Sequence, residues 1–120
     1  MLPDIRPQLY RKDNNMKGHF VIDKVAVSIM ERCSPINIIL VSNKIDTTEK
    51  LISFKLAVIV NDDVKSISEL ECNLYMQVDS EVPYDLVLYK LSEWNKLKND
   101  IGTFAWKIYN SGVYLYGTRV

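Results

Sequence analysis

Apolar residues alternate along the chain between helix-like and strand-like spacing. Over residues 19–32 they recur every three or four positions, which indicates an α-helix, and Pro35 ends that segment. The segments 36–41 and 56–60 are short and rich in β-branched residues, and apolar residues occupy both their odd-numbered and their even-numbered positions. Strands that are covered on both faces have this pattern, so we predict one helix followed by two buried strands.

The middle of the chain predicts a loop, a helix and a strand. Residues 42–52 are polar and rich in turn-forming side chains, which indicates a loop of about ten residues. Ser66 and Glu69 have the spacing of a capping box, and the apolar stripe behind them predicts a helix over residues 66–79. Residues 86–89 then predict a third strand.

Two short helices and a closing strand complete the predicted order. Ser92 is the expected N-cap of a helix that runs through Leu97, and a second helix is expected over residues 102–110. Gly112 is expected in the left-handed position just after that helix, before a strand over residues 113–116.

This order predicts an α/β (α+β) domain in which helices pack on a small mixed β-sheet. Residues 1–18 show no apolar period and are interpreted as a flexible N-terminal tail, which leaves residues 19–120 as the single domain. With 120 residues, of which 48% are apolar, the chain is long enough for one modest core.

Charge and targeting signals exclude several classes of function. Lys and Arg number 15, as do Asp and Glu, so no net positive field favours nucleic acid, and binding to it is not expected. No apolar run approaches the ~20 residues that span a bilayer, and no signal-peptide pattern is present, so we expect a cytoplasmic protein without a membrane segment. Cys33 and Cys72 lack metal-site spacing and are expected to be reduced thiols.

The order of motifs from residue 38 to residue 116 resembles the minimal nucleotidyltransferases of the DNA polymerase β-like superfamily. That family has an apolar strand ending in Gly-Ser, a second strand opened by Ser-Asp-x-Asp, and a later strand that supplies a third carboxylate. The segments that carry the resemblance here are Ile39-Leu40-Val41-Ser42, Leu56 to Val60, Pro83-Tyr84-Asp85-Leu86-Val87-Leu88-Tyr89, Ser92-Glu93-Trp94, Lys98-Asn99-Asp100, Thr103-Phe104 and Gly112-Val113-Tyr114-Leu115-Tyr116.

The resemblance implies a nucleotidyltransferase-like fold with a degenerate site at Ser42, Ser53, Lys55 and Asp85. Ser53 and Lys55 stand where the family has its first two metal-binding aspartates, and only Asp85 is retained. Nucleotidyl transfer needs divalent metal held by clustered carboxylates, and Lys55 places a cation there instead. Val41 also replaces the glycine that lets backbone approach the phosphates.

Lys55 suggests a structural substitute for the metal. Residues 53 and 55 share one face of a strand, so both are expected to face Asp85. We therefore expect Lys55 and Asp85 to form a partly buried ion pair, the alternative being a Lys55 side chain that extends into solvent.

Other candidate sites have simpler explanations. Asp62 and Asp63 are interpreted as turn residues, and Glu69 and Glu71 as helix surface, rather than as a metal site. His19 is the only histidine and has no motif-spaced partner. A set of lysines and aromatic residues has the side-chain types of a nucleic-acid surface, but we interpret it as amphipathic helices with a core stripe and a solvated face. The set is Lys90, Lys96, Lys98, Lys107, Trp94, Trp106 and Tyr109.

The function expected from the resemblance is that of a catalytically degenerate nucleotidyltransferase-fold protein. Active relatives act with an all-helical HEPN-domain protein, some as antitoxins, so we expect a protein partner, of HEPN type, or a homo-oligomer. No cofactor and no metal is expected. The alternative is an active transferase or nucleotide-binding domain that uses Mg²⁺ and a nucleoside triphosphate with an atypical site at Ser42 and Asp85.

Overall fold

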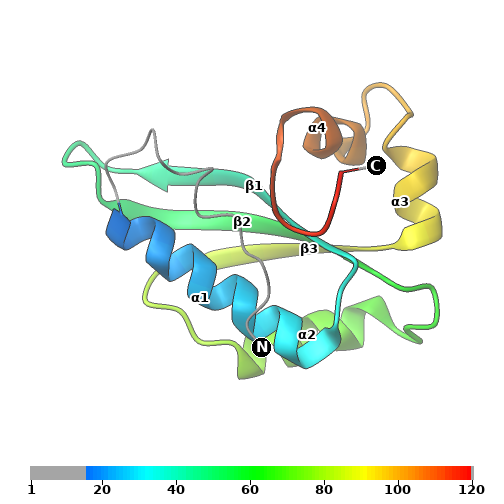
Figure 1. Cartoon of the computed structure of the whole chain (residues 1–120), viewed down its shortest axis with the longest axis horizontal. Coiled ribbons are helices and arrows are strands. Elements are labelled where there is room, and N and C mark those ends of the chain that lie inside the picture. Colours follow the sequence, from blue (N-terminus) through cyan, green and yellow to red (C-terminus); the bar gives the residue numbers. More distant parts are fainter. Residues whose placement is uncertain (1–15, 120) are drawn as a thin grey trace.

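A four-stranded sheet with helices on both faces forms the domain in the computed structural model, which describes residues 16–119, the side chains of residues 16–18 excepted (Figure 1). The elements in chain order are α1 (Met16–Cys33), β1 (Asn37–Ile45), β2 (Leu51–Val60), α2 (Ile67–Gln77), β3 (Tyr84–Lys90), α3 (Leu91–Leu97), α4 (Phe104–Ser111) and β4 (Val113–Tyr116). The predicted order of elements and the mixed α+β class are confirmed.

The strand order in the sheet is β3-β2-β1-β4. β1 runs antiparallel to both β2 and β4, whereas β2 and β3 run parallel and are connected through α2. β1 and β2 thus lie at the centre of the sheet, which explains why their apolar stretches show no alternation.

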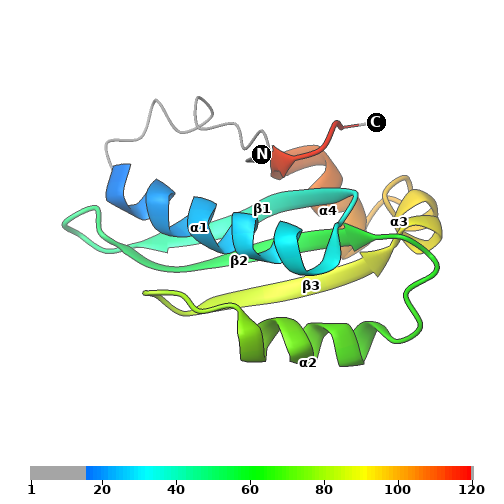
Figure 2. The ribbon, with the colours of Figure 1, turned by 60° about the horizontal axis from the view of Figure 1, so that its bottom comes forward.

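The two faces of the sheet support separate apolar clusters. Leu56 and Val58 of β2 belong to the cluster beneath α1 and α2, and Ala57 and Ile59 to the cluster beneath α3 and α4. All four side chains are fully buried. Figure 2 shows α1 and α2 on one face of the sheet and α4 on the opposite face. The alternate residues of β2 therefore join both halves of the core.

The predicted loop over residues 42–52 is wrong, because the flanking strands extend into it. β1 continues to Ile45 and β2 begins at Leu51, so only a short turn remains. The Asp46 carboxylate organises this turn by accepting hydrogen bonds from the Thr48 amide, the Thr48 hydroxyl and the Lys50 amide, at 2.8, 2.7 and 2.9 Å. Polar residues here form an exposed hairpin rather than a loop.

The predicted cap of α2 is confirmed and that of α3 is wrong. The Ser66 hydroxyl accepts a hydrogen bond from the Glu69 amide at 3.2 Å. Ser92, in contrast, lies inside α3, where its amide donates to the Asp62 carboxylate at 3.0 Å. A side chain 30 positions earlier in the sequence thus supplies the cap, which local spacing does not reveal.

The expected left-handed conformation of Gly112 is also wrong. Its φ is −73°, a value open to any residue. Glycine is required there for space, because a Cβ at this position would lie 2.5 Å from Cγ2 of Ile39 and 2.7 Å from the carbonyl oxygen of Ile108. The absence of a side chain lets the end of α4 pack directly on β1.

The predicted boundary at residue 19 lies inside α1, which begins at Met16. Residues 16–18 are therefore helical, and residues 1–15 of the expected tail lie outside the described part of the chain. Within residues 16–119, the helices are all too short or too polar to span a bilayer.

Candidate functional site

The four predicted site residues line one pocket of about 300 Å³ at the end of the sheet nearest the β1–β2 hairpin. Ser42 comes from β1, Ser53 and Lys55 from β2, and Asp85 from β3. Three strands that are separate in the sequence therefore assemble the pocket.

Strand register explains why these residues meet. Lys55 is the register partner of Asp85 on one side and of Ser42 on the other. A register shift between Leu40 and Ser42 places Ser42 in this row, because without it Ser42 would be displaced from Lys55 by one position. Ser53 lies two positions before Lys55 and shares its face of the strand.

The predicted ion pair between Lys55 and Asp85 is wrong, although the two residues are neighbours in the sheet. The Lys55 ammonium lies over the ring of Phe104, 5.6 Å from its centroid, and no ion pair links it to Asp85. Phe104 is the first residue of α4 and is 44% exposed. The attraction between a cation and an aromatic face holds the ammonium at the rim of the pocket instead.

The pocket does not have the donor set of a divalent metal site. Asp85 supplies its single carboxylate, whereas Lys44 and Lys55 bring two ammonium groups. Mg²⁺ prefers several oxygen ligands and carboxylate charge, which this lining does not offer. Within residues 16–119, no group of three or more His, Cys, Asp and Glu side chains is placed to hold a metal ion.

Val41 packs against the apolar cluster under α3 and α4. It lies between Leu40 and Ser42 at the register shift, where the family motif has its glycine. Its branched side chain therefore contributes to the core rather than leaving room for a phosphate to approach the backbone.

Sequence reasoning missed Asn43, Lys44 and Phe54, which complete the lining of this pocket. Asn43 and Lys44 fell within the expected loop, yet they belong to β1 and pair with Phe54 and Ser53 of β2. The alternation of apolar and polar residues over residues 52–55 was the available signal for the extended hairpin.

Several of the other residues that the sequence offered as candidate sites have structural roles. Asp62 caps α3 as described above. Trp94 is only 3% exposed and packs against Tyr89 and Tyr109, so its ring face is not available for stacking on a base. Both cysteines are free thiols.

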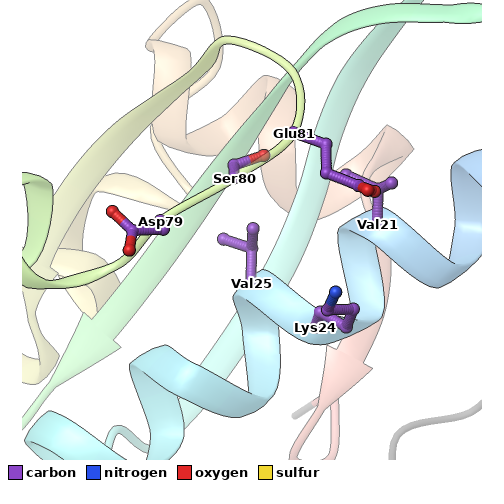
Figure 3. A pocket seen from close by; sticks show the side chains of 6 residues that line it. All are labelled: Val21, Lys24, Val25, Asp79, Ser80 and Glu81. Carbon is purple, nitrogen blue, oxygen red and sulfur yellow. The ribbon is translucent and has the colours of Figure 1, made fainter.

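A second pocket, of about 310 Å³, lies between α1 and the segment that follows α2 (Figure 3). Val21 and Val25 of α1 form its apolar side, and Asp79 and Glu81 come from the opposite segment. None of the residues singled out from the sequence lines it, and we assign it no role.

No protein-family model, no curated protein and no solved structure matches the chain. The residues and their arrangement are therefore the basis for a function of this chain.

Proposed function

We propose that this chain is a nucleotidyltransferase-like protein that has lost metal-dependent transfer and acts as a protein-binding module. The observation that supports this most strongly is the row of Ser42, Lys55 and Asp85, in which a lysine occupies a position that the family motif gives to a metal-binding aspartate. The charge of Lys55 opposes metal binding in the pocket, so the scaffold is retained while the requirement for phosphoryl transfer is lost.

The rim of the pocket supports the binding role. Phe104 is 44% exposed beside Lys55, and Ile101, three positions earlier, is 78% exposed. Exposed aromatic and aliphatic side chains of this kind serve as anchors in protein interfaces. By analogy with the family that the sequence resembles, we propose an all-helical HEPN-type protein as the partner.

Transfer is tested by incubating the purified chain with labelled nucleoside triphosphates, Mg²⁺ or Mn²⁺ and candidate protein or RNA acceptors. We expect no labelled product above the level given by the Asp85→Ala variant, because one carboxylate does not hold the metals that the reaction needs. Label transfer by the wild-type chain that Asp85→Ala abolishes would contradict the proposal.

The binding role is tested with the product of the neighbouring gene, if that gene encodes a HEPN-type protein. We expect Phe104→Ala to weaken the complex at least tenfold in calorimetric titration, a typical effect at an interface anchor. Phe20→Ala is the matched control, because Phe20 is 62% exposed on α1 and also has a lysine ammonium over its ring, at 5.5 Å. Equal losses in both variants, or none in either, would contradict binding through this rim.

A second candidate function is nucleotide binding without transfer. Lys44 and Lys55 line the pocket together with the hydroxyl-bearing Ser42 and Ser53, and such groups suit phosphate oxygens. Calorimetry with ATP, with and without Mg²⁺, distinguishes the two candidates. Saturable ATP binding that Lys44→Ala and Lys55→Ala each weaken favours this function, and no heat of binding favours a module for protein contact alone.

A further inference from the structure

A third pocket, of about 430 Å³, lies near the opposite end of β1 from the candidate site. Asn37 of β1, Trp94 and Lys98 from the α3 region, Tyr114 of β4 and Thr118 contribute to its walls. Its volume falls within the ~300–1,000 Å³ that is usual for small-molecule sites. The pocket shares no residue with the candidate site and does not depend on the function proposed above.

Asn37 offers an unused hydrogen-bond acceptor in this pocket. The side chain is only 6% exposed, and its Nδ2 donates to the carbonyl oxygens of Tyr116 and Thr118, both at 3.3 Å. Those two bonds identify the nitrogen of the amide, because only the NH₂ group donates. No residue of the described chain donates a hydrogen bond to the remaining oxygen, Oδ1.

Gly117 is what allows Asn37 to take this position. Its φ is +81°, in the left-handed region, and a Cβ there would lie 2.3 Å from Nδ2 of Asn37. The chain can therefore turn closely over the amide between Tyr116 and Thr118. Asn37 is thus fixed by its nitrogen, which leaves Oδ1 as the acceptor without a partner.

Trp94 and Tyr114 offer two unused donors in the same pocket. They are 3% and 7% exposed, and neither the indole N–H nor the phenol O–H donates a hydrogen bond within residues 16–119. Burial raises the pKa of Tyr114, which keeps its hydroxyl protonated and able to donate near neutral pH. Both rings otherwise belong to the apolar cluster beneath α3 and α4.

These three side chains are almost fully buried, yet each has a polar atom without a hydrogen-bond partner in the described part of the chain. None of the three is among the polar atoms that the fold seals off from solvent. The feature that the three side chains share is the pocket, so we infer that Oδ1 of Asn37, Nε1 of Trp94 and Oη of Tyr114 face it. A ligand that supplies their missing partners would replace water there.

We propose that this pocket binds a small organic carboxylate that also carries a hydroxyl or amino group. The carboxylate accepts hydrogen bonds from the Trp94 indole and the Tyr114 hydroxyl. Lys98, whose ammonium lies over the ring of Tyr109 at 5.1 Å, adds positive charge to the pocket wall without being required as a direct partner. The hydroxyl or amino group of the ligand donates to Oδ1 of Asn37. Two neutral donors, one cation and one acceptor thus match an anion that has a single donor group.

The test is nuclear magnetic resonance on the full ¹⁵N-labelled chain, titrated with three probes of increasing size: glycine, lactate and 4-hydroxybenzoate. The chain has two tryptophans, and only Trp94 lines the pocket, so its indole N–H resonance reports on binding while that of Trp106 is the internal control. Trp106→Phe assigns the two resonances. We expect at least one probe to shift the Trp94 signal saturably and to leave Trp106 in place.

Matched ligands and variants test the chemistry. For the probe that binds, we expect the neutral primary amide of the same acid to bind at least tenfold more weakly. Tyr114→Phe, which removes only the donor, is expected to weaken binding about tenfold, the value of one buried hydrogen bond of ~1.4 kcal/mol. Tyr116→Phe is the control, because Tyr116 packs on the other face of the sheet.

Results of three kinds, from the probes, the control resonance and the matched ligands and variants, would overturn the proposal. The first is that none of the three carboxylates shifts the Trp94 signal at 10 mM. The second is that Trp106 shifts as much as Trp94, which would indicate general weak association. The third is that the amide binds as well as the acid, or that Tyr114→Phe leaves the dissociation constant unchanged.

Discussion

At the scale of the residue, the chemistry of the candidate site depends on Lys55. The side chain lies in a row with Ser42 and Asp85, and Lys44 and Asp85 are the other charged residues of the lining, so the residue at position 55 sets the sign of the net charge of the pocket. Its ammonium is held over Phe104 rather than by Asp85, and therefore its charge is not cancelled by the neighbouring carboxylate. The same contact brings the first turn of α4 to the rim of the pocket.

Restoring two carboxylates to this row tests whether the backbone still has the geometry of a metal site. We expect the double variant Ser53→Asp, Lys55→Asp to be less stable than the wild type without metal, because three neighbouring carboxylates repel one another. We expect its melting temperature to rise with millimolar Mn²⁺, since binding to the folded state stabilises it.

The double variant Ser53→Asn, Lys55→Asn is the matched control, because it has similar side-chain volumes without the charges. Its melting temperature, like that of the wild type, is expected to stay constant when Mn²⁺ is added. If the aspartate variant shows no change with Mn²⁺ either, the row does not have the spacing of a metal site, and the resemblance to a transferase site is weakened.

At the scale of the element, the β1–β2 hairpin shows how a polar segment becomes ordered. Its turn depends on Asp46, whose carboxylate accepts three hydrogen bonds, and on Glu49, whose φ of 65° reverses the chain. The hairpin positions Ser42 and Lys44 opposite Lys55 and Ser53. The candidate pocket is consequently built by the segment that looks most like a loop in the sequence.

The pH dependence of this turn follows from the pKa of Asp46. Hydrogen bonds from Thr48 and Lys50 lower that pKa in the folded protein. A depressed pKa means that the turn is fully stabilised above the pKa of an unfolded aspartate, ~3.9, and that this stabilisation is lost as the pH falls through the lower folded value. We expect the amide chemical shifts of Thr48 and Lys50 to titrate together below pH 4.

Asp46→Ala removes the acceptor and is expected to abolish this titration and to speed hydrogen exchange at the Thr48 and Lys50 amides. Asp46→Asn keeps a neutral acceptor, so it should abolish the titration while largely preserving protection from exchange. Identical exchange in Asp46→Ala and the wild type would show that the hairpin is ordered without this side chain.

At the scale of the whole molecule, one sheet joins two apolar clusters. Val58 and Ile59 are adjacent in β2 and fully buried, yet they face α1 and α2 on one side and α3 and α4 on the other. Loss of β2 would disrupt both clusters at once. The two halves of the core are therefore expected to unfold together.

Val58→Ala and Ile59→Ala test this coupling from the two faces. We expect each to cost ~2–4 kcal/mol of unfolding free energy, as large-to-small core substitutions do. We also expect each variant to show one transition in urea, with coincident midpoints by far-ultraviolet circular dichroism and by tryptophan fluorescence, which reports the face that contains Trp94. Separate midpoints in either variant would show that the two faces unfold independently.

Prediction from the sequence succeeded where a signal is local and failed where a contact joins distant segments. Apolar periodicity located α1, and the Ser66 capping box located the start of α2. The cap of α3 was missed because it comes from Asp62, on the connection that follows β2. The close packing of Gly112 on Ile39 was missed for the same reason, since local spacing indicates only that a glycine ends the helix.

The sequence by itself determined the order of helices and strands, the mixed α+β class and the four positions of the candidate site, because periodicity and motif order are local properties of the chain. Only the tertiary structure decided how those positions are arranged. The strand register places Lys55 between Ser42 and Asp85, and the packing of α4 brings the ring of Phe104 beneath its ammonium. The pocket at Asn37, Trp94 and Tyr114 is likewise a product of folding, since residues up to 82 positions apart line it. The packing of helices on the sheet sets the distances between such residues, and the order of polar and apolar residues along the chain does not specify them.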